Sequence, residues 1–361
     1  MRTLPHYLAL AATLFCAGAQ AADLNLYNWA DYLGPDTLRK FERETGIKVF
    51  LGTFDSDETL EARMLTGNSG YDLVVVPSDF LTRHIRAGVY APLDRAQLPN
   101  WDNLDSHLLK QLESADPGNQ YGVPYLWGSV GIGYNVEKVR AVLGENAPVD
   151  SLALLFEPGN LSQLKQCGVA FIDGPSRVIP SMLKYLQRDP NTQQEEDYRL
   201  VERKLLELRP SVTSINSTKY FGDLANGDIC VAFGYSGDIL QAQQSAAEAG
   251  KPYHIDYRLP KEGSNLWFDM FAIPADARNK REAHQFIDFM MRPEVISEVA
   301  NYLHYAHPNQ AAASLTNTEL RDNPNIYPGP EQLSRMTVNA DQDRKTLRLT
   351  NRIWTTFKTG K

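Results

Sequence analysis

The chain has 361 residues and a formal net charge of -8 at pH 7, because 44 acidic residues outnumber 36 basic ones. This balance argues against a nucleic acid partner, which would need a basic surface. The acidity is compatible with a cationic ligand, although solubility alone would also favour it. The length exceeds that of one ordinary domain, so we expect two lobes.

Residues 1–21 have the features of a secretory signal peptide. Arg2 precedes an apolar stretch from Leu8 to Phe15, and Ala19-Gln20-Ala21 has the small residues of a cleavage site. The apolar stretch is too short to span a bilayer, and no later run approaches the roughly 18 to 20 apolar residues that a spanning helix needs. We therefore expect a mature chain that begins near Ala22 and lies outside the cytoplasm.

The sequence holds three cysteines, and two of them, Cys167 and Cys230, lie in the predicted mature chain. A compartment outside the cytoplasm favours disulfides, so we predict that these two residues are paired. Both lie beside apolar runs, so two buried thiols on neighbouring strands are the alternative. The cysteines are far apart and have no histidine partners at ligand spacing, which argues against a structural zinc site.

The first part of the predicted mature chain alternates between strand and helix patterns. Apolar residues alternate from Leu24 to Trp29, as in a strand. A continuous β-branched run from Tyr71 to Pro77 is typical of a strand buried on both faces of a parallel sheet. The other expected elements are a helix that ends at Gly46, a strand over 48–53, a helix from about 55 to 67, and a helix that ends at Gly88.

These strands lead into loops that carry aromatic and acidic residues. Trp29, Asp31 and Tyr32 come at the end of the first strand, and Asp79 follows the buried third strand. In open α/β sheets, ligands bind outside the carboxyl ends of the strands. We therefore expect Trp29, Asp31 and Tyr32 to form one wall of a site. The alternative is an exposed loop with a single packed tryptophan.

From Tyr121 to Asn135 the chain is rich in aromatic residues and glycine, which suits a strand that crosses between two lobes. A second α/β unit is expected to follow. One later strand ends in Tyr235 and Asp238, and another segment brings Trp267 and Asp269 into an apolar run. The remaining expected elements are strands over 169–173 and 229–233 and helices over 195–208, 280–291 and 293–302, with Tyr305 in a loop after the last helix.

The sequence offers no motif for covalent catalysis. A nucleophile elbow needs glycine two places after its serine, but Asp238 stands two places after Ser236. The histidines show no spacing typical of metal ligands, and no glycine-rich phosphate loop occurs. We therefore expect a protein that is not an enzyme and that holds no metal and no cofactor.

Aromatic residues paired with acids recur at the predicted strand ends. An aromatic face attracts a cation by about 0.5 to 2 kcal/mol, and a carboxylate adds a charge-assisted hydrogen bond. Together these groups describe a slot for an alkylammonium ion, with its methylene chain between the rings. The alternative is that the rings fill cores and the aspartates cap helices. The residues concerned are Trp29 with Asp31 and Tyr32, Tyr235 with Asp238, Trp267 with Asp269, and also Trp127 and Tyr305.

The chain also resembles a known family from about residue 24 to residue 361. The most specific segments are Tyr27–Tyr32, Gly131–Asn135, Asp223–Cys230, Gly237-Asp238 and Phe268–Ala272. They resemble the periplasmic substrate-binding proteins of bacterial polyamine ABC transporters, most closely the putrescine-binding branch. The resemblance implies an α/β fold of two lobes joined by crossing strands, with the ligand enclosed in the interlobe cleft. It also implies hinge closure that presents the closed form to a membrane permease.

Under this resemblance, we expect one lobe to comprise residues 22–126 with 251–307 and the other to comprise residues 127–250 with 308–361. We expect a periplasmic monomer whose ligand is a small cationic amine and whose membrane partner is an ABC permease. A secreted enzyme on a similar scaffold is one alternative. A ligand sensor that signals through a membrane partner is another.

The resemblance also implies roles within the site. Asp238 and Asp269 would hold one ammonium group, and Trp29 and Trp267 would line the alkyl chain. Tyr235 stands where the putrescine-binding branch usually has tryptophan. The full set of positions that match the family's binding residues is Trp29, Asp31, Tyr32, Asp238, Trp267, Asp269 and Tyr305.

Two departures from the family concern the far end of the site. Where the family has a glutamate for the far amine, this chain has Ser176 and Arg177, and Asp79 replaces a usual serine. Two hypotheses stay open. Asp79 binds the second amine, which keeps a diamine or polyamine ligand, or Arg177 binds a carboxylate, which favours an ω-amino acid such as 4-aminobutyrate. An unpaired buried ammonium would cost most of the affinity.

Overall fold

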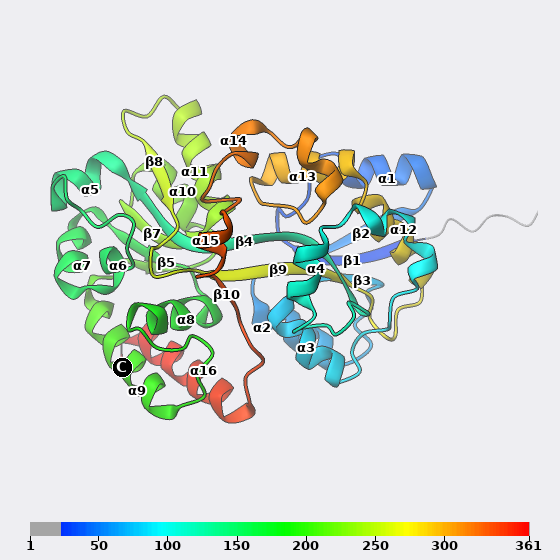
Figure 1. The fold of residues 1–361 in the computed structure, drawn as a ribbon, viewed down its shortest axis with the longest axis horizontal. Helices are drawn as coiled ribbons and strands as arrows, with labels where there is room; N and C mark the ends of the chain where they lie inside the picture. The colour runs from blue at the N-terminus through cyan, green and yellow to red at the C-terminus, as the bar shows by residue number, and fades with distance from the viewer. Residues whose placement is uncertain (1–22, 361) are drawn as a thin grey trace, which may run out of the picture.

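The structure, a computed structural model, describes residues 23–360, so the signal peptide predicted for residues 1–21 lies outside the described residues. Two α/β units share one sheet (Figure 1). Its strands are β1 (Asp23–Trp29), β2 (Lys48–Phe54), β3 (Leu73–Pro77), β4 (Gly122–Asn135), β5 (Val169–Phe171), β6 (Ser214–Ile215), β7 (Val231–Tyr235), β8 (Ile255–Arg258), β9 (Asn265–Ala272) and β10 (Thr337–Val338). Their order is β2-β1-β3-β9-β4-β7-β5-β6, with β10 paired to β9 and β8 paired to β4.

The first unit holds β1, β2 and β3 in parallel, with β9 antiparallel to β3. All residues of β3 are buried, as the continuous apolar run predicts, because helices cover both faces of this sheet (Figure 1). The helices of this unit are α1 (Thr37–Thr45), α2 (Asp57–Leu65), α3 (Ser78–Arg86), α4 (Ser106–Leu112), α12 (Lys280–Met290) and α13 (Pro293–Leu303).

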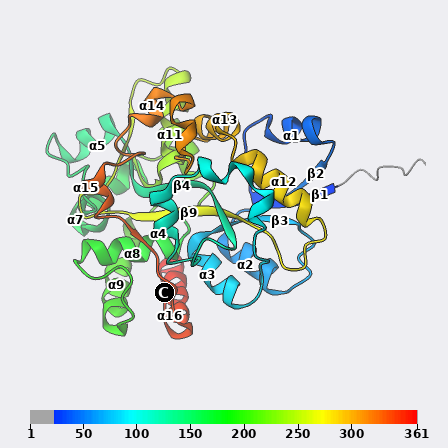
Figure 2. The same ribbon diagram turned by 45° about the vertical axis from the view of Figure 1, so that its right-hand side comes forward.

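The second unit holds β5, β6 and β7 in parallel, with β7 antiparallel to β4. Figures 1 and 2 show the C-terminal helix α16 (Arg344–Thr359) packed beside α8 (Pro175–Tyr185) and α9 (Glu195–Leu208). The other helices after β4 are α5 (Val136–Leu143), α6 (Ala153–Phe156), α7 (Pro158–Leu164), α10 (Tyr220–Asn226), α11 (Ser236–Glu248), α14 (Thr318–Arg321) and α15 (Pro330–Leu333).

β4 joins the two units because its halves pair with different strands. Gly122–Ser129 pairs with β9, and Val130–Tyr134 pairs with β7. All 14 residues of β4 are buried. This strand therefore crosses between the units, as its aromatic and glycine-rich sequence predicts. β8 pairs with Ile132–Asn135 of β4, which favours placing β8 with the second unit. The lobe boundaries given above stay a prediction.

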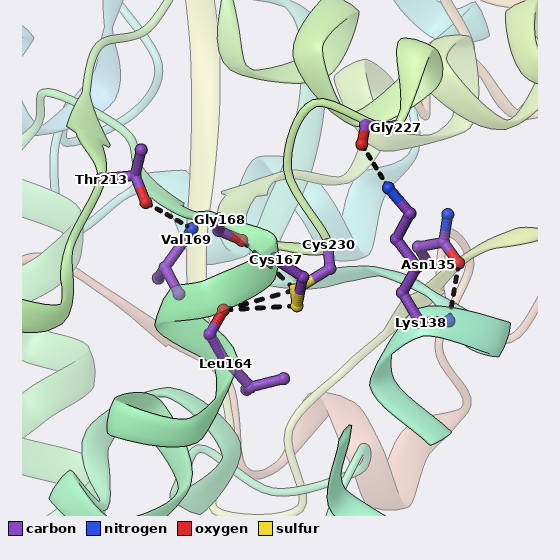
Figure 3. Close-up of a disulfide and its surroundings, with 9 residues drawn as sticks. All are labelled: Asn135, Lys138, Leu164, Cys167, Gly168, Val169, Thr213, Gly227 and Cys230. Carbon is purple, nitrogen blue, oxygen red and sulfur yellow. Dashed lines mark hydrogen bonds between the residues drawn. A yellow bond between two sulfur atoms is a disulfide. The ribbon is translucent and has the colours of Figure 1, made fainter. Parts of the chain in front are cut away.

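A disulfide joins Cys167 and Cys230, as predicted (Figure 3). The two residues are 63 positions apart in the sequence, and their Cα atoms lie 5.4 Å apart. Cys167 stands two residues before β5 and Cys230 directly precedes β7, so the bond ties together the starts of two neighbouring parallel strands. Close to it, the backbone N–H of Val169 donates to the hydroxyl of Thr213 at 3.0 Å (Figure 3).

Breaking the disulfide should destabilise the fold. A bond that closes a loop of this length lowers the entropy of the unfolded chain, which contributes about 4 kcal/mol in the chain-entropy model. We expect Cys167→Ala/Cys230→Ala to lower the free energy of unfolding by about 2 to 4 kcal/mol in urea denaturation. A reductant should lower the wild type to the same value and leave the variant unchanged. Equal stability of wild type and variant under oxidising conditions would contradict this prediction.

Candidate ligand-binding site

A cavity of about 190 Å³ is lined by residues of both units, near the carboxyl ends of the strands. The first unit supplies Trp29 at the end of β1, and the second supplies Tyr235 at the end of β7. This is the place where open α/β sheets bind their ligands. The predicted site residues that line the cavity are Trp29, Asp31, Tyr32, Arg177, Tyr235, Asp238, Trp267, Asp269 and Tyr305.

β9 contributes two of these side chains from one face, because alternate residues of a strand point to the same side. Trp267 and Asp269 are two positions apart, and both line the cavity. Gly128 of β4 pairs with Trp267, and a Cβ on this glycine would lie 2.7 Å from the indole ring. A Cβ on Gly237 would lie 2.5 Å from the ring of Tyr305. The two glycines therefore leave room for the two rings.

Trp267 lies at the centre of an aromatic wall. Its ring centroid is 5.7 Å from that of Tyr235 and 5.2 Å from that of Tyr305, with interplanar angles of 83° and 76°. Tyr32 extends the wall, since its ring lies 5.8 Å from that of Tyr305. Edge-to-face contacts of this kind fix the orientation of the rings. The rings therefore hold one another in place along this side of the cavity.

Asp238 lies in the first turn of α11 and accepts two short hydrogen bonds. The hydroxyl of Tyr305 donates to Oδ1 at 2.6 Å, and the hydroxyl of Tyr220 donates to Oδ2 at 2.7 Å. Burial raises the pKa of Asp238 to about 6, although the two phenols act in the opposite direction. Within residues 23–360 this carboxylate has neutral donors as partners and no ion pair.

Asp269 is only 6% exposed, and burial raises its pKa to about 7. Tyr32 lies beside it and lowers this pKa to a smaller extent. The pKa of Tyr32 is itself well above its ordinary value, because the phenol is buried and close to Asp269, so Tyr32 stays neutral. Two aspartates with raised pKa values in one cavity are typical of a functional site, and a bound cation would return both to the ionised form.

Arg177 and Asp79 form a buried ion pair at another part of the cavity. Nη1 of Arg177 donates to Oδ2 of Asp79 at 2.9 Å, and Nη2 lies 3.5 Å from Oδ1. Nη1 also donates to Asn265 at 3.3 Å, and the side-chain amide of Asn339 donates to Asp79 at 3.2 Å. Burial would raise the pKa of Asp79, but the charge of Arg177 and the hydrogen bonds outweigh it and lower this pKa. Both partners therefore stay charged.

This ion pair joins the two residues that the sequence-based hypotheses treated separately. Within the part of the chain that the structure describes, Arg177 lines the cavity, whereas Asp79 and Ser176 do not. The backbone oxygen of Ser176 accepts a hydrogen bond from Asn339 at 2.8 Å. Arg177 and Asp79 are 98 positions apart, so no local pattern predicts their contact.

The loop from Asp55 to Asp57 also lines the cavity, although the sequence predicts this segment only as a helix start. It does start α2, because Oγ of Ser56 accepts the N–H of Thr59 at 3.2 Å. The loop follows the carboxyl end of β2, so the rule that placed Trp29 and Asp31 at a site could also have found it.

Asp173, which the sequence reasoning gave no binding role, also lines the cavity. Its carboxylate accepts the indole N–H of Trp354 at 2.7 Å and forms an ion pair with Lys358. Both partners belong to α16. The negative charge of Asp173 is therefore already balanced by the C-terminal helix.

The described residues contain no metal site, and their second cavity lacks the features of an ammonium site. No group of three His, Cys, Asp or Glu side chains in residues 23–360 could hold a metal ion. A second cavity, of about 230 Å³, has Arg258, Lys261 and Arg335 in its lining. Two of these are already in ion pairs, Arg258 with Asp256 and Arg335 with Glu331. No aromatic side chain of the described residues lines this second cavity.

Residues 36–328 match the model of the bacterial extracellular solute-binding protein family. The chain belongs to this family. It is 48% identical to the putrescine-binding periplasmic protein SpuD of Pseudomonas aeruginosa (strain UCBPP-PA14), over 98% of each chain. It is 46% identical to the putrescine-binding periplasmic protein PotF of Escherichia coli (strain K12), over 98% of this chain and 95% of PotF.

A solved structure confirms the predicted two-lobed α/β fold of this solute-binding protein. The spermidine/putrescine ABC transporter substrate-binding protein PotD of Streptococcus pneumoniae superposes with a TM-score of 0.77 and 28% identity, over 94% of this chain and 99% of that chain. The periplasmic relatives confirm the predicted location. Across residues 23–360, none of the helices has the length and hydrophobicity that a bilayer crossing requires.

Proposed function

We propose that this protein captures a small aliphatic amine of the diamine or polyamine class in the periplasm and delivers it to the permease of an ABC importer. The observation that carries the proposal is the pair of Asp238 and Asp269, a half-buried and a buried carboxylate beside an aromatic wall, neither of which forms an ion pair among the described residues. SpuD and PotF, which are named for putrescine, support it. We also propose that the protein acts as a monomer and catalyses no reaction.

In this proposal, one ammonium group of the ligand lies between Asp238 and Asp269 and donates to both carboxylates. Charge-assisted hydrogen bonds of this kind are stronger than those of the neutral phenols alone. The methylene chain lies against Trp267, and Trp29 covers its other side. Tyr305 keeps Asp238 in place through its hydrogen bond. The ammonium thus supplies the positive charge that the buried carboxylates lack.

Closure of the two lobes about β4 and β9 would enclose the ligand. The cavity is lined by both units, so an enclosed ligand contacts both and stabilises the closed form over the open one. The permease would then recognise the closed form. A sensor function would use the same closure, and growth on the ligand as sole nitrogen source, with and without this protein, separates import from signalling.

Isothermal titration calorimetry tests the proposal. The mature chain is unfolded and refolded to remove bound ligand and is then titrated with putrescine, cadaverine, spermidine, spermine and 4-aminobutyrate. Binding of a diamine or polyamine with a dissociation constant in the micromolar range or below is the expected result. Heat from 4-aminobutyrate alone would replace the proposal with binding of an ω-amino acid.

Asp269→Asn should weaken binding of putrescine by at least about 100-fold, because it removes one of the two charges that hold the ammonium in a buried site. The dissociation constant from calorimetry measures the effect. The matched control is Asp322→Asn, the same change at an exposed aspartate paired with Arg321, which should leave the affinity unaltered. Unchanged affinity in Asp269→Asn would refute the assigned ammonium position.

Binding should release protons at slightly acidic pH. In the ligand-free cavity, burial raises the pKa of Asp269 to about 7 and that of Asp238 to about 6. An ammonium beside them lowers both pKa values, so protonated carboxyls must lose their protons when the ligand binds. Affinity should therefore fall as the pH is lowered from about 7 to about 5, and it should be constant above about pH 8.

Calorimetry at pH 6.5 in two buffers with different ionisation enthalpies measures this proton release. The same pair of buffers at pH 8.5 is the control, in which the observed heat should no longer depend on the buffer. Uptake of protons at pH 6.5 would be the wrong sign and would rule out ammonium binding to these carboxylates.

A further inference from the structure

We propose that Arg177 selects a ligand with an ammonium group at one end and a neutral hydrogen-bond acceptor, such as an amide carbonyl, at the other. The ligand class is then a mono-N-acylated diamine. This inference rests on the proposed function, because it takes binding of the ammonium by Asp238 and Asp269 as its starting point.

The strand β9 separates the two ends of the site. Asn265, Trp267 and Asp269 are alternate residues of this strand and share one face of it. The guanidinium of Arg177 donates to Asn265, so it lies at the start of this row. Asp269 comes four residues later, about 13 Å further along the strand at roughly 3.3 Å per residue. The row thus runs from a guanidinium, past an aromatic ring, to a carboxylate.

Among the described residues, Nε of Arg177 is the one guanidinium nitrogen without a hydrogen-bond partner. Its side chain is only 4% exposed, and its two terminal nitrogens are directed to Asp79 and Asn265. Nε is buried, has no hydrogen-bond partner among the described residues, and belongs to a side chain that lines the cavity. A buried N–H without an acceptor is unfavourable, so an acceptor on the ligand would be bound in preference to a donor.

The charges around Arg177 favour a neutral acceptor over a carboxylate. Asp79 already balances the guanidinium, and Asp57, whose charge also acts on Arg177, lines the same cavity. A ligand carboxylate would therefore enter surroundings that are already negative. A second ammonium presents only donors, so it cannot accept the N–H of Nε and would be held by an acid of the lining instead. An amide carbonyl accepts this N–H and adds no charge to the negative surroundings.

The test is calorimetry on the refolded mature chain with n-butylamine, putrescine, N-acetylputrescine and 4-aminobutyrate. n-Butylamine provides the ammonium and the alkyl chain alone. We expect N-acetylputrescine to bind at least about tenfold more tightly than each of the other three, as one satisfied buried donor would give.

The other outcomes separate this inference from the proposed function. If putrescine binds most tightly, an acid such as Asp57 holds a second ammonium, so the inference is overturned and the proposed function stands. If 4-aminobutyrate binds most tightly, Arg177 binds a carboxylate, which also overturns the inference. If none of the four amines binds, the inference is overturned, and if cadaverine, spermidine and spermine also give no heat, the proposed function itself fails.

A double variant tests the role of Arg177 directly. Asp79→Asn/Arg177→Gln removes both charges together and so leaves neither ion buried without its partner. In this variant, the advantage of N-acetylputrescine over n-butylamine, taken as the ratio of the two dissociation constants measured on the same variant, should fall below about threefold. An undiminished advantage would overturn the inference.

The matched control is Asp322→Asn/Arg321→Gln, which removes an exposed ion pair of the same residue types. It should leave all four affinities unaltered. If the cavity variant does not refold, the ranking of the four ligands on the wild-type chain decides the inference alone.

Discussion

The antiparallel contact between β4 and β9 is the constraint on which the site depends. β4 pairs with β9 over its first half and with β7 over its second half, so strands of both units end around one cavity. The register of the contact also sets Gly128 against Trp267, which gives the indole its space. A shift of one residue along β9 would turn Trp267 and Asp269 away from the cavity, since alternate residues face opposite sides.

The affinity proposed for a cation follows from two carboxylates that are withdrawn from water and have no ion-pair partner among the described residues. Asp238 and Asp269 lose their hydration when the units enclose them, and phenols replace only part of it, which is why both pKa values are raised. Burying these two carboxylates without a bound cation costs free energy, and this cost opposes closure of the cleft. In the proposed function, a bound ammonium removes this penalty. Ligand binding and closure are then coupled through the same two carboxylates.

The local elements could be predicted from the sequence because the periodicity of burial is a local property. The helix expected over 195–208 is α9 (Glu195–Leu208). The strand expected over 169–173 is β5 (Val169–Phe171), which is two residues shorter because α8 begins at Pro175. Strand ends also predicted most of the residues that line the cavity. The contacts of Arg177 with Asp79 and of Asp173 with Trp354 could not be predicted, because they span 98 and 181 positions and depend on how the units and α16 pack.

The ion pair of Asp79 and Arg177 has a different effect on closure from that of the two unpaired carboxylates. Asp79 lies in the first turn of α3 in the first unit, and Arg177 lies in α8 of the second, so separation of the units would return both ions to water. The Coulomb energy of a buried pair and the hydration energy that it loses are opposed and of similar size. The pair therefore gives closure little net driving force. The ammonium end of the ligand would then determine whether the cleft closes, and Arg177 would determine which group the closed cleft accepts at the other end.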